Sequence, residues 1–140
     1  MATIIEDYVS FETAKLLKEK GFDEICYLGY NKNGEYIPTG NRTNSQIIQP
    51  DFCLICCPTL QMAMKWLREV HNLHIMVNCI GKVNYDPIIQ SFDGKDFEID
   101  GVEVGITKHI NGKYINVRRG FKTYENACEA AIKYCLINLI

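Results

Sequence analysis

The chain has 140 residues, of which 47% are hydrophobic and 23% are charged, and its formal net charge is -2. This length fits one domain, residues 1–140, which can bury enough apolar surface to fold without metal or disulfide crosslinks. The charge balance argues against a bulk nucleic-acid binder, which needs an excess of lysine and arginine, although it allows a local basic patch. No apolar run approaches the roughly 18 residues that span a bilayer, so we expect no membrane association.

The N-terminus and the cysteines indicate a reducing compartment. Acids at Glu6 and Asp7, with no basic start and no apolar core, are unlike a secretory signal peptide. The number of cysteines is odd, and most lie in apolar stretches: Cys26, Cys53, Cys56, Cys57, Cys79, Cys128 and Cys135. Because a reduced thiol behaves as a small buried hydrophobe, we expect a cytoplasmic protein with core cysteines.

Three helices are predicted from their capping residues and from apolar residues at helical spacing. The first begins after Ser10 and ends at Gly21, which supplies a left-handed exit. The second begins after Thr59 and stops at Asn72, which tolerates the left-handed conformation. The third begins after Thr123 and continues to the end of the chain.

Between the helices the apolar period changes from 3.6 to two, which indicates strands. The clearest strand is 73–80, and further strand signals lie at 97–99, 102–106 and 115–117. Four dipeptides favour tight turns: Asn33-Gly34, Asp93-Gly94, Asp100-Gly101 and Asn111-Gly112. Adjacent hairpins imply antiparallel pairing. The polar segment 39–51 is predicted to be one long, mobile loop.

These elements predict an α+β fold. We expect one antiparallel sheet of about five or six strands, built from hairpins, with two or three helices packed mainly on one face. The predicted core comprises Phe11, Leu17, Phe22, Leu60, Ala63, Trp66, Leu67, Ile75, Val77, Val104, Ile106, Val117, Ala127, Ala131 and Leu136.

A metal site is one hypothesis for the paired cysteines and histidines. Cys53 and Cys56 are followed further along the chain by His71 and His74, and two thiolates with two imidazoles can close a tetrahedral zinc site. The histidine spacing is one residue too short for a zinc finger, and it straddles a predicted helix end. The alternative is that residues 52–57 form a buried apolar strand, in which case we expect no metal or other cofactor.

A basic hairpin is the second candidate site. Its residues surround the predicted turn at Asn111-Gly112: Lys108, His109, Lys113, Tyr114, Arg118, Arg119 and Lys122. A β-ribbon of this kind can follow phosphates, and Arg118 and Arg119 precede a helix start that favours anions. The alternative is a solvated edge strand whose charges prevent aggregation.

Tyrosines near the first hairpin form a third candidate. Tyr27, Tyr30 and Tyr36, with Tyr85 further along, suit either a protein interface or ordinary packing across strands. No nucleophile elbow, phosphate-binding glycine loop or His-Glu-x-x-His motif is present, so we do not expect an enzyme.

Three stretches, 9–23, 58–71 and 123–136, resemble a group of small uncharacterised proteins of gut bacteria and of their phages or mobile elements. The resemblance covers the three predicted helices. It implies a cytoplasmic accessory protein that is phage-borne or carried by a mobile element, and it transfers no functional residue, because no activity is established for that group.

Two functional classes follow from these patterns. The first is a non-enzymatic interaction or regulatory protein, acting in host takeover or counter-defence, that contacts another protein through an uncovered sheet face, an edge strand or the 39–51 loop. Met76 and Ile80 would furnish apolar contacts. The alternative is a module that binds nucleic acid or a small anionic ligand such as a nucleotide through the hairpin 108–122. Assembly into a homo-oligomer is compatible with both.

Overall fold

A computed structural model describes residues 4–80, 84–101 and 104–140. For residues 80, 104–110 and 114–119 it describes the backbone only. The helices are α1 (Phe11–Glu19), α2 (Leu60–His71) and α3 (Tyr124–Tyr134), with a 3₁₀ turn η1 (Asn44–Gln46) and a π-helical turn η2 (Cys135–Leu139). The strands are β1 (Cys26–Tyr30), β2 (Tyr36–Arg42), β3 (Ile55–Cys56), β4 (His74–Ile80), β5 (Asn84–Gln90), β6 (Asp96–Glu98), β7 (Val104–Ile110) and β8 (Lys113–Gly120).

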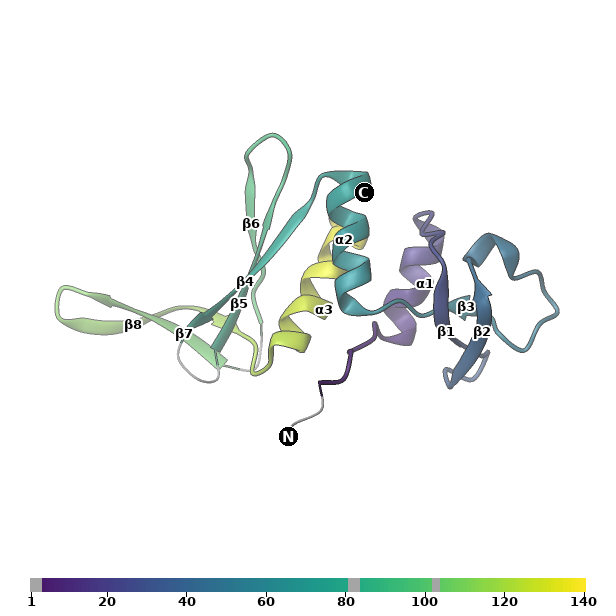
Figure 1. Ribbon diagram of the computed structural model, residues 1–140. Helices are drawn as coiled ribbons and strands as arrows, with labels where there is room; N and C mark the ends of the chain where they lie inside the picture. The colour runs from purple at the N-terminus through teal and green to yellow at the C-terminus, as the bar shows by residue number, and fades with distance from the viewer. Residues whose placement is uncertain (1–3, 81–83, 102–103) are drawn as a thin grey trace.

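The helices form a central layer between two sheets (Figure 1). On one side lies an antiparallel sheet in the order β2-β1-β3, against which α1 packs. On the other side lies an antiparallel sheet in the order β4-β5-β6, whose inner face is covered by α2 and α3. The class is therefore α+β with antiparallel pairing, as the sequence predicts.

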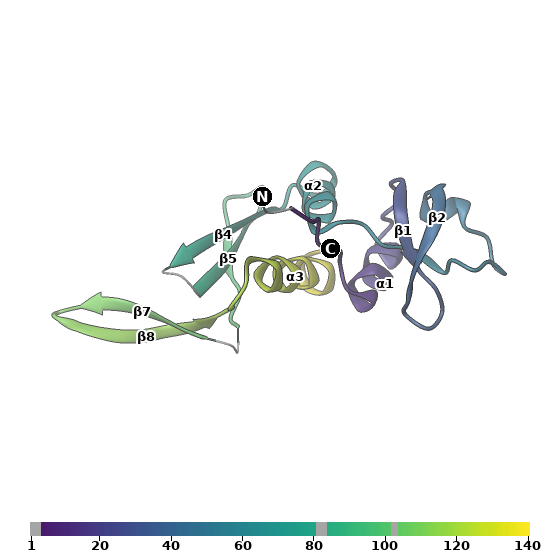
Figure 2. The same ribbon diagram turned by 60° about the horizontal axis from the view of Figure 1, so that its bottom comes forward.

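The strands β7 and β8 form a separate two-stranded hairpin, which we call the arm. Its base contacts β5, where Tyr85 and Phe121 form an isolated bridge. Figures 1 and 2 show the rest of the arm extending away from the helices. The arm lies on the β5 side of the second sheet, so the outer edge of β4 faces away from it (Figure 2).

The three predicted helix starts are confirmed. The hydroxyls of Ser10, Thr59 and Thr123 each accept a hydrogen bond from the backbone N–H three residues later. Asn72 ends α2 in the left-handed conformation, with φ 55°. After α1, the backbone N–H of Phe22 donates to the carbonyl of Leu17 at 2.9 Å, which completes a Schellman ending.

One cluster of buried side chains runs from Val9 to Leu136 and links all three helices with both sheets. Nine of the predicted core residues are buried: Leu17, Phe22, Leu60, Ala63, Trp66, Leu67, Ala127, Ala131 and Leu136. Phe11, Ile75 and Val77 are half-buried and pack against this cluster. The side chains of Val104, Ile106 and Val117 lie outside the described part of the chain.

The prediction of one sheet of five or six strands is wrong, because the strands divide between two three-stranded sheets and the arm. After β3 the chain enters α2, whose 12 residues span about 18 Å, so β4 starts on the opposite side of the helical layer. Similarly, Asp100-Gly101 does not join a hairpin in the described structure, since β6 pairs with β5 while β7 pairs with β8.

The prediction of a long loop over 39–51 is also wrong in large part. β2 continues to Arg42, and the next residues form η1, which is closed by a capping box between Thr43 and Gln46. Two anchors hold the segment: the Arg42 guanidinium donates to both carboxylate oxygens of Asp51 at 2.9 and 3.1 Å, and the side chain of Asn44 is buried. The ordering therefore comes from an ion pair within the segment and from hydrogen bonds of Asn44 to the backbone of Phe22 and Cys56.

Candidate functional site

The outer edge of β4 is the first candidate site, because in the described structure this strand pairs with β5 alone. All seven residues of β4 pair in continuous register, from His74 opposite Gln90 to Ile80 opposite Asn84, without a bulge. The outward N–H and C=O groups of such an edge are a template for another strand.

The chemistry of β4 differs from that of the other described sheet edges. It contains no Asp, Glu, Lys, Arg or Pro. By contrast, β2 carries Pro38 and pairs through an irregular register, β3 has two residues, and β6 has three residues including Asp96 and Glu98. Charges, prolines, bulges and shortness are the devices that block edge pairing, and β4 lacks all of them.

Side chains of β4 alternate between the two faces of the sheet. Ile75 and Val77 are half-buried and pack against the core under the helices. His74, Met76 and Asn78 are exposed, and Met76 leaves 45% of its surface accessible. The outer edge is therefore flanked by one apolar layer and by one accessible face that includes a methionine, a flexible side chain common at binding surfaces.

The arm confirms the predicted turn at Asn111-Gly112, where both residues have positive φ. Its backbone register places His109 opposite Tyr114, Lys108 opposite Ile115, Ile106 opposite Arg118 and Gly105 opposite Arg119. Of the predicted basic site, the side chains of Lys113 and Lys122 are described and exposed, whereas those of Lys108, His109, Tyr114, Arg118 and Arg119 lie outside the described part.

The four residues of the zinc hypothesis do not converge. Within the described residues, no group of three or more His, Cys, Asp or Glu side chains is arranged to hold a metal ion. Cys53 and Cys56 are buried in the first sheet region, at and just before β3. His71 ends α2 with its ring 4.7 Å from that of Trp66, and His74 is exposed on β4 across the helical layer.

Most cysteines are buried as expected, and no disulfide links any of the seven, all of which the structure describes. Burial raises the pKa of Cys57 to about 12 and that of Cys128 to about 11. The interaction between the neighbouring thiols of Cys26 and Cys56 raises the pKa of Cys26 and lowers that of Cys56, and the Cys56 thiol donates to the carbonyl of Arg42 at 3.3 Å. Cys79 on β4 is the exception to the prediction of core cysteines, because it is exposed.

Two of the tyrosines near the first hairpin, Tyr30 and Tyr36, stack on each other. Tyr30 is buried and donates its hydroxyl hydrogen to the carbonyl of Val9 at 2.6 Å. The Tyr36 ring lies against that of Tyr30, with centroids 5.0 Å apart, and remains 60% exposed. Tyr27 is 75% exposed. Packing across the hairpin therefore accounts for Tyr30, while Tyr27 and Tyr36 present surface to solvent.

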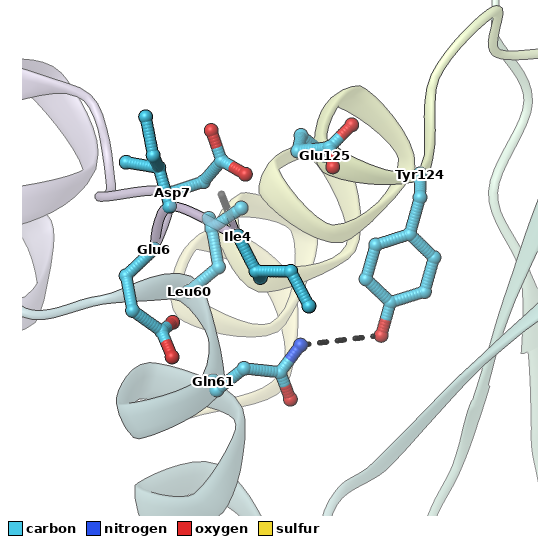
Figure 3. A pocket seen from close by; sticks show the side chains of 8 residues that line it. Ile4, Glu6, Asp7, Leu60, Gln61, Tyr124 and Glu125 are labelled. Atoms are coloured by element: carbon cyan, nitrogen blue, oxygen red, sulfur yellow. Dashed lines mark hydrogen bonds between the residues drawn. The ribbon is translucent and has the colours of Figure 1, made fainter. Parts of the chain in front are cut away.

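A hollow of about 270 Å³ lies where the N-terminal segment crosses the starts of α2 and α3 (Figure 3). Glu6, Asp7 and Glu125 contribute carboxylates to its lining, and the amide of Gln61 donates to the hydroxyl of Tyr124 at 3.3 Å. None of the residues that line this hollow is basic. Its chemistry is therefore unsuited to the anionic ligand considered for the arm.

No family model, curated protein or solved structure matches the chain. Among the residues that the structure describes, no helix is long and apolar enough to cross a membrane. The β4 edge is thus assigned on its own geometry. Sequence analysis predicted the strand and the accessibility of Met76, but nothing in 73–80 indicated that this strand lies at a sheet edge.

Proposed function

We propose that this protein is a non-enzymatic, cytoplasmic accessory protein that binds another protein chain by adding a strand to the outer edge of β4. One observation carries the proposal: β4 is a regular, seven-residue sheet edge without a charge, a proline or a bulge. A phage or mobile-element setting, as the helix stretches suggest, fits a small protein that regulates a host component by contact.

Backbone hydrogen bonds to an incoming strand supply affinity, and side chains on the two faces supply specificity. On the accessible face, an added strand would lie beside Met76, while on the inner face it would extend the layer of Ile75 and Val77. Retaining this edge carries a risk of aggregation, which natural proteins normally suppress. A binding role explains why the edge is left open.

The experiment compares affinity capture by the wild-type protein with capture by a Met76→Lys/Asn78→Lys variant, using extract of the host. Both substituted residues are exposed, so the fold should be retained. We expect a partner that the wild type captures and the variant loses, and amide hydrogen exchange of β4 should slow when that partner binds. Met62→Lys, at a methionine 39% exposed on α2, is the matched control. Equal capture by all three proteins, together with the same oligomeric state in all three, would contradict the proposal.

A second function, polyanion binding by the arm, is favoured by charge segregation. Residues 104–122 hold five of the 15 Lys and Arg residues and none of the 17 Asp and Glu residues. The rest of the chain therefore carries 10 basic against 17 acidic residues, a formal charge of -7. An isolated two-stranded hairpin adds little stability of its own, and its basic composition suits contact with phosphates, as in nucleic acid.

Salt-dependent binding to short DNA and RNA tests this second function. If the arm contacts phosphates, the logarithm of the affinity should fall linearly with the logarithm of salt concentration, and Arg118→Ala/Arg119→Ala should reduce that slope by about 1 to 2. Lys65→Ala/Arg68→Ala on α2 removes the same charge from another surface and should leave the slope unchanged. Absence of binding at low salt would exclude the arm as a polyanion site.

A further inference from the structure

Five residues of β4, 74–78, are symmetric in chemical type about Met76. On either side of it stand the β-branched residues Ile75 and Val77, and beyond them the polar residues His74 and Asn78. The next positions outward, Leu73 and Cys79, are both apolar in type. Over residues 73–79 the chemical order is therefore the same in both directions, whereas Ile80, the last residue of β4, has Asn72 as its counterpart.

In a two-fold antiparallel pair of identical strands, each residue faces the residue at the mirrored position of the second strand, so a chemically symmetric pattern brings similar side chains together. If the axis passes between the two copies of Met76, Ile75 lies opposite Val77 of the second copy, and His74 lies opposite Asn78 of the second copy. Directly opposite residues of an antiparallel pair share a face and have Cβ atoms about 5 Å apart. Apolar side chains therefore meet apolar ones, and polar side chains meet polar ones.

We propose that the partner strand at the β4 edge is β4 of a second copy, so that the protein forms a two-fold dimer with a continuous sheet β6-β5-β4-β4-β5-β6. This inference rests on the proposed function, in which β4 accepts an added strand, and it names the occupant. The dimer keeps each pair of inward residues on the helix-covered face, so the apolar layer beneath α2 continues across the axis.

Charge supports a second copy as the occupant. Like charges opposite each other destabilise a strand pair, and β4 contains no Asp, Glu, Lys or Arg that self-pairing would bring together. The basic arm lies on the β5 side of the sheet, away from the β4 edge, so the arms of the two copies do not meet at the axis (Figure 2).

The first experiment measures the oligomeric state by sedimentation equilibrium. Because a single strand pair is a small interface, loadings from about 5 to about 500 µM cover the expected affinity. We expect wild-type protein to dimerise. Met76→Lys and Met76→Glu should each weaken the dimer at least about tenfold, since two like charges would face each other across the axis.

Mixing the two variants separates loss of the interface from loss of the fold. An equimolar mixture of Met76→Lys and Met76→Glu should recover the dimer, because the heterodimer opposes unlike charges. Met62→Lys should dimerise as the wild type does. A mixture that stays monomeric while the wild type dimerises would show that the copies do not meet at Met76.

A second experiment tests the register. With Cys79→Ser as background, Met76→Cys should form an intermolecular disulfide on mild oxidation, because the two introduced thiols face each other across the axis. Asn78→Cys in the same background faces His74 of the second copy and should crosslink far less. Equal crosslinking of both variants would overturn the proposed register.

The inference and the proposed function fail separately. The wild-type protein could be monomeric at every loading and still capture a host protein that the Met76→Lys/Asn78→Lys variant does not capture. That result would overturn the dimer and support strand addition by a host protein. A monomer that shows no capture dependent on β4 would overturn both.

Discussion

Substitution of Asn44 offers a direct test of how the 39–51 segment is held. This side chain is 7% exposed, and it bridges two distant backbone groups. Its amide nitrogen donates to the carbonyl of Phe22 at 2.9 Å, and its oxygen accepts from the backbone N–H of Cys56 at 2.9 Å. Asn44→Ala leaves both of these backbone groups without a partner in the interior.

A buried polar group left unsatisfied costs roughly 1–3 kcal/mol, so two such groups lower the free energy of unfolding by about 2–6 kcal/mol. This is a large part of the roughly 5–15 kcal/mol typical of a domain. With a urea m-value of about 2 kcal/mol/M, a loss of about 4 kcal/mol moves the unfolding midpoint down by about 2 M. Urea unfolding followed by circular dichroism measures this shift.

Asn44→Asp adds a pH dependence of known sign. The ionised carboxylate still accepts from Cys56 but cannot donate to Phe22, so folding raises its pKa above the unfolded value of about 4. The variant's free energy of unfolding should therefore fall furthest below that of the wild type at neutral pH. The difference should shrink as the pH falls toward about 4, where the protonated acid can donate to the carbonyl of Phe22.

The neighbouring exposed residue Ser45 provides the control. Its hydroxyl donates to Asp23 at 2.7 Å on the surface, and Ser45→Ala should change stability by less than about 1 kcal/mol. If Asn44→Ala shifts the midpoint no more than Ser45→Ala does, the segment is not anchored through Asn44.

Three further outcomes are expected. In native protein at about pH 8, a thiol reagent should react quickly with about one cysteine, the exposed Cys79, because the other cysteines are buried. Burial also raises the pKa of Cys135 to about 12, which keeps that thiol protonated. Rapid reaction of several cysteines would contradict this expectation. Hydrogen bonding by Arg42 lowers the pKa of Asp51 from 3.8 to about 2, so this pair adds stability above about pH 4 that is lost as the pH falls toward 2. Asp51→Asn should therefore flatten the dependence of the urea midpoint on pH in this range. A pH dependence equal to that of the wild type would contradict this. Gly29→Ala should lower the free energy of unfolding by about 1–3 kcal/mol in the same assay, because the added Cβ would lie 2.5 Å from a backbone oxygen of β3. An unaltered urea midpoint would show that the backbone of the sheet shifts to accommodate the methyl group.

Elements governed by local chemistry were predicted correctly. The helix starts at Ser10, Thr59 and Thr123 depend on a hydroxyl three residues from the amide that it satisfies, and the stop at Asn72 depends on that residue's own tolerance of positive φ. The strand over 73–80 follows from its alternation. These features need no knowledge of the rest of the chain.

The candidate site was only partly predictable. Alternation in 73–80 indicates that Met76 points away from the core, but any strand can occupy the centre of a sheet or its edge. Whether β4 is an edge depends on where β6 and the arm lie, and these positions are separated from β4 in sequence. The zinc hypothesis failed for the same reason, because spacing along the chain does not determine which side of the helical layer His74 occupies.

The amino-acid sequence alone determined the helices, their caps, the turn at Asn111-Gly112 and most of the buried side chains, because each rests on interactions within a few residues or on hydrophobic period. The division into two sheets, the anchoring of 39–51 through Asn44, and the exposure of the β4 edge were visible only in the folded protein. These depend on contacts between residues far apart in the chain, whose formation is governed by the packing of the whole core rather than by local preference.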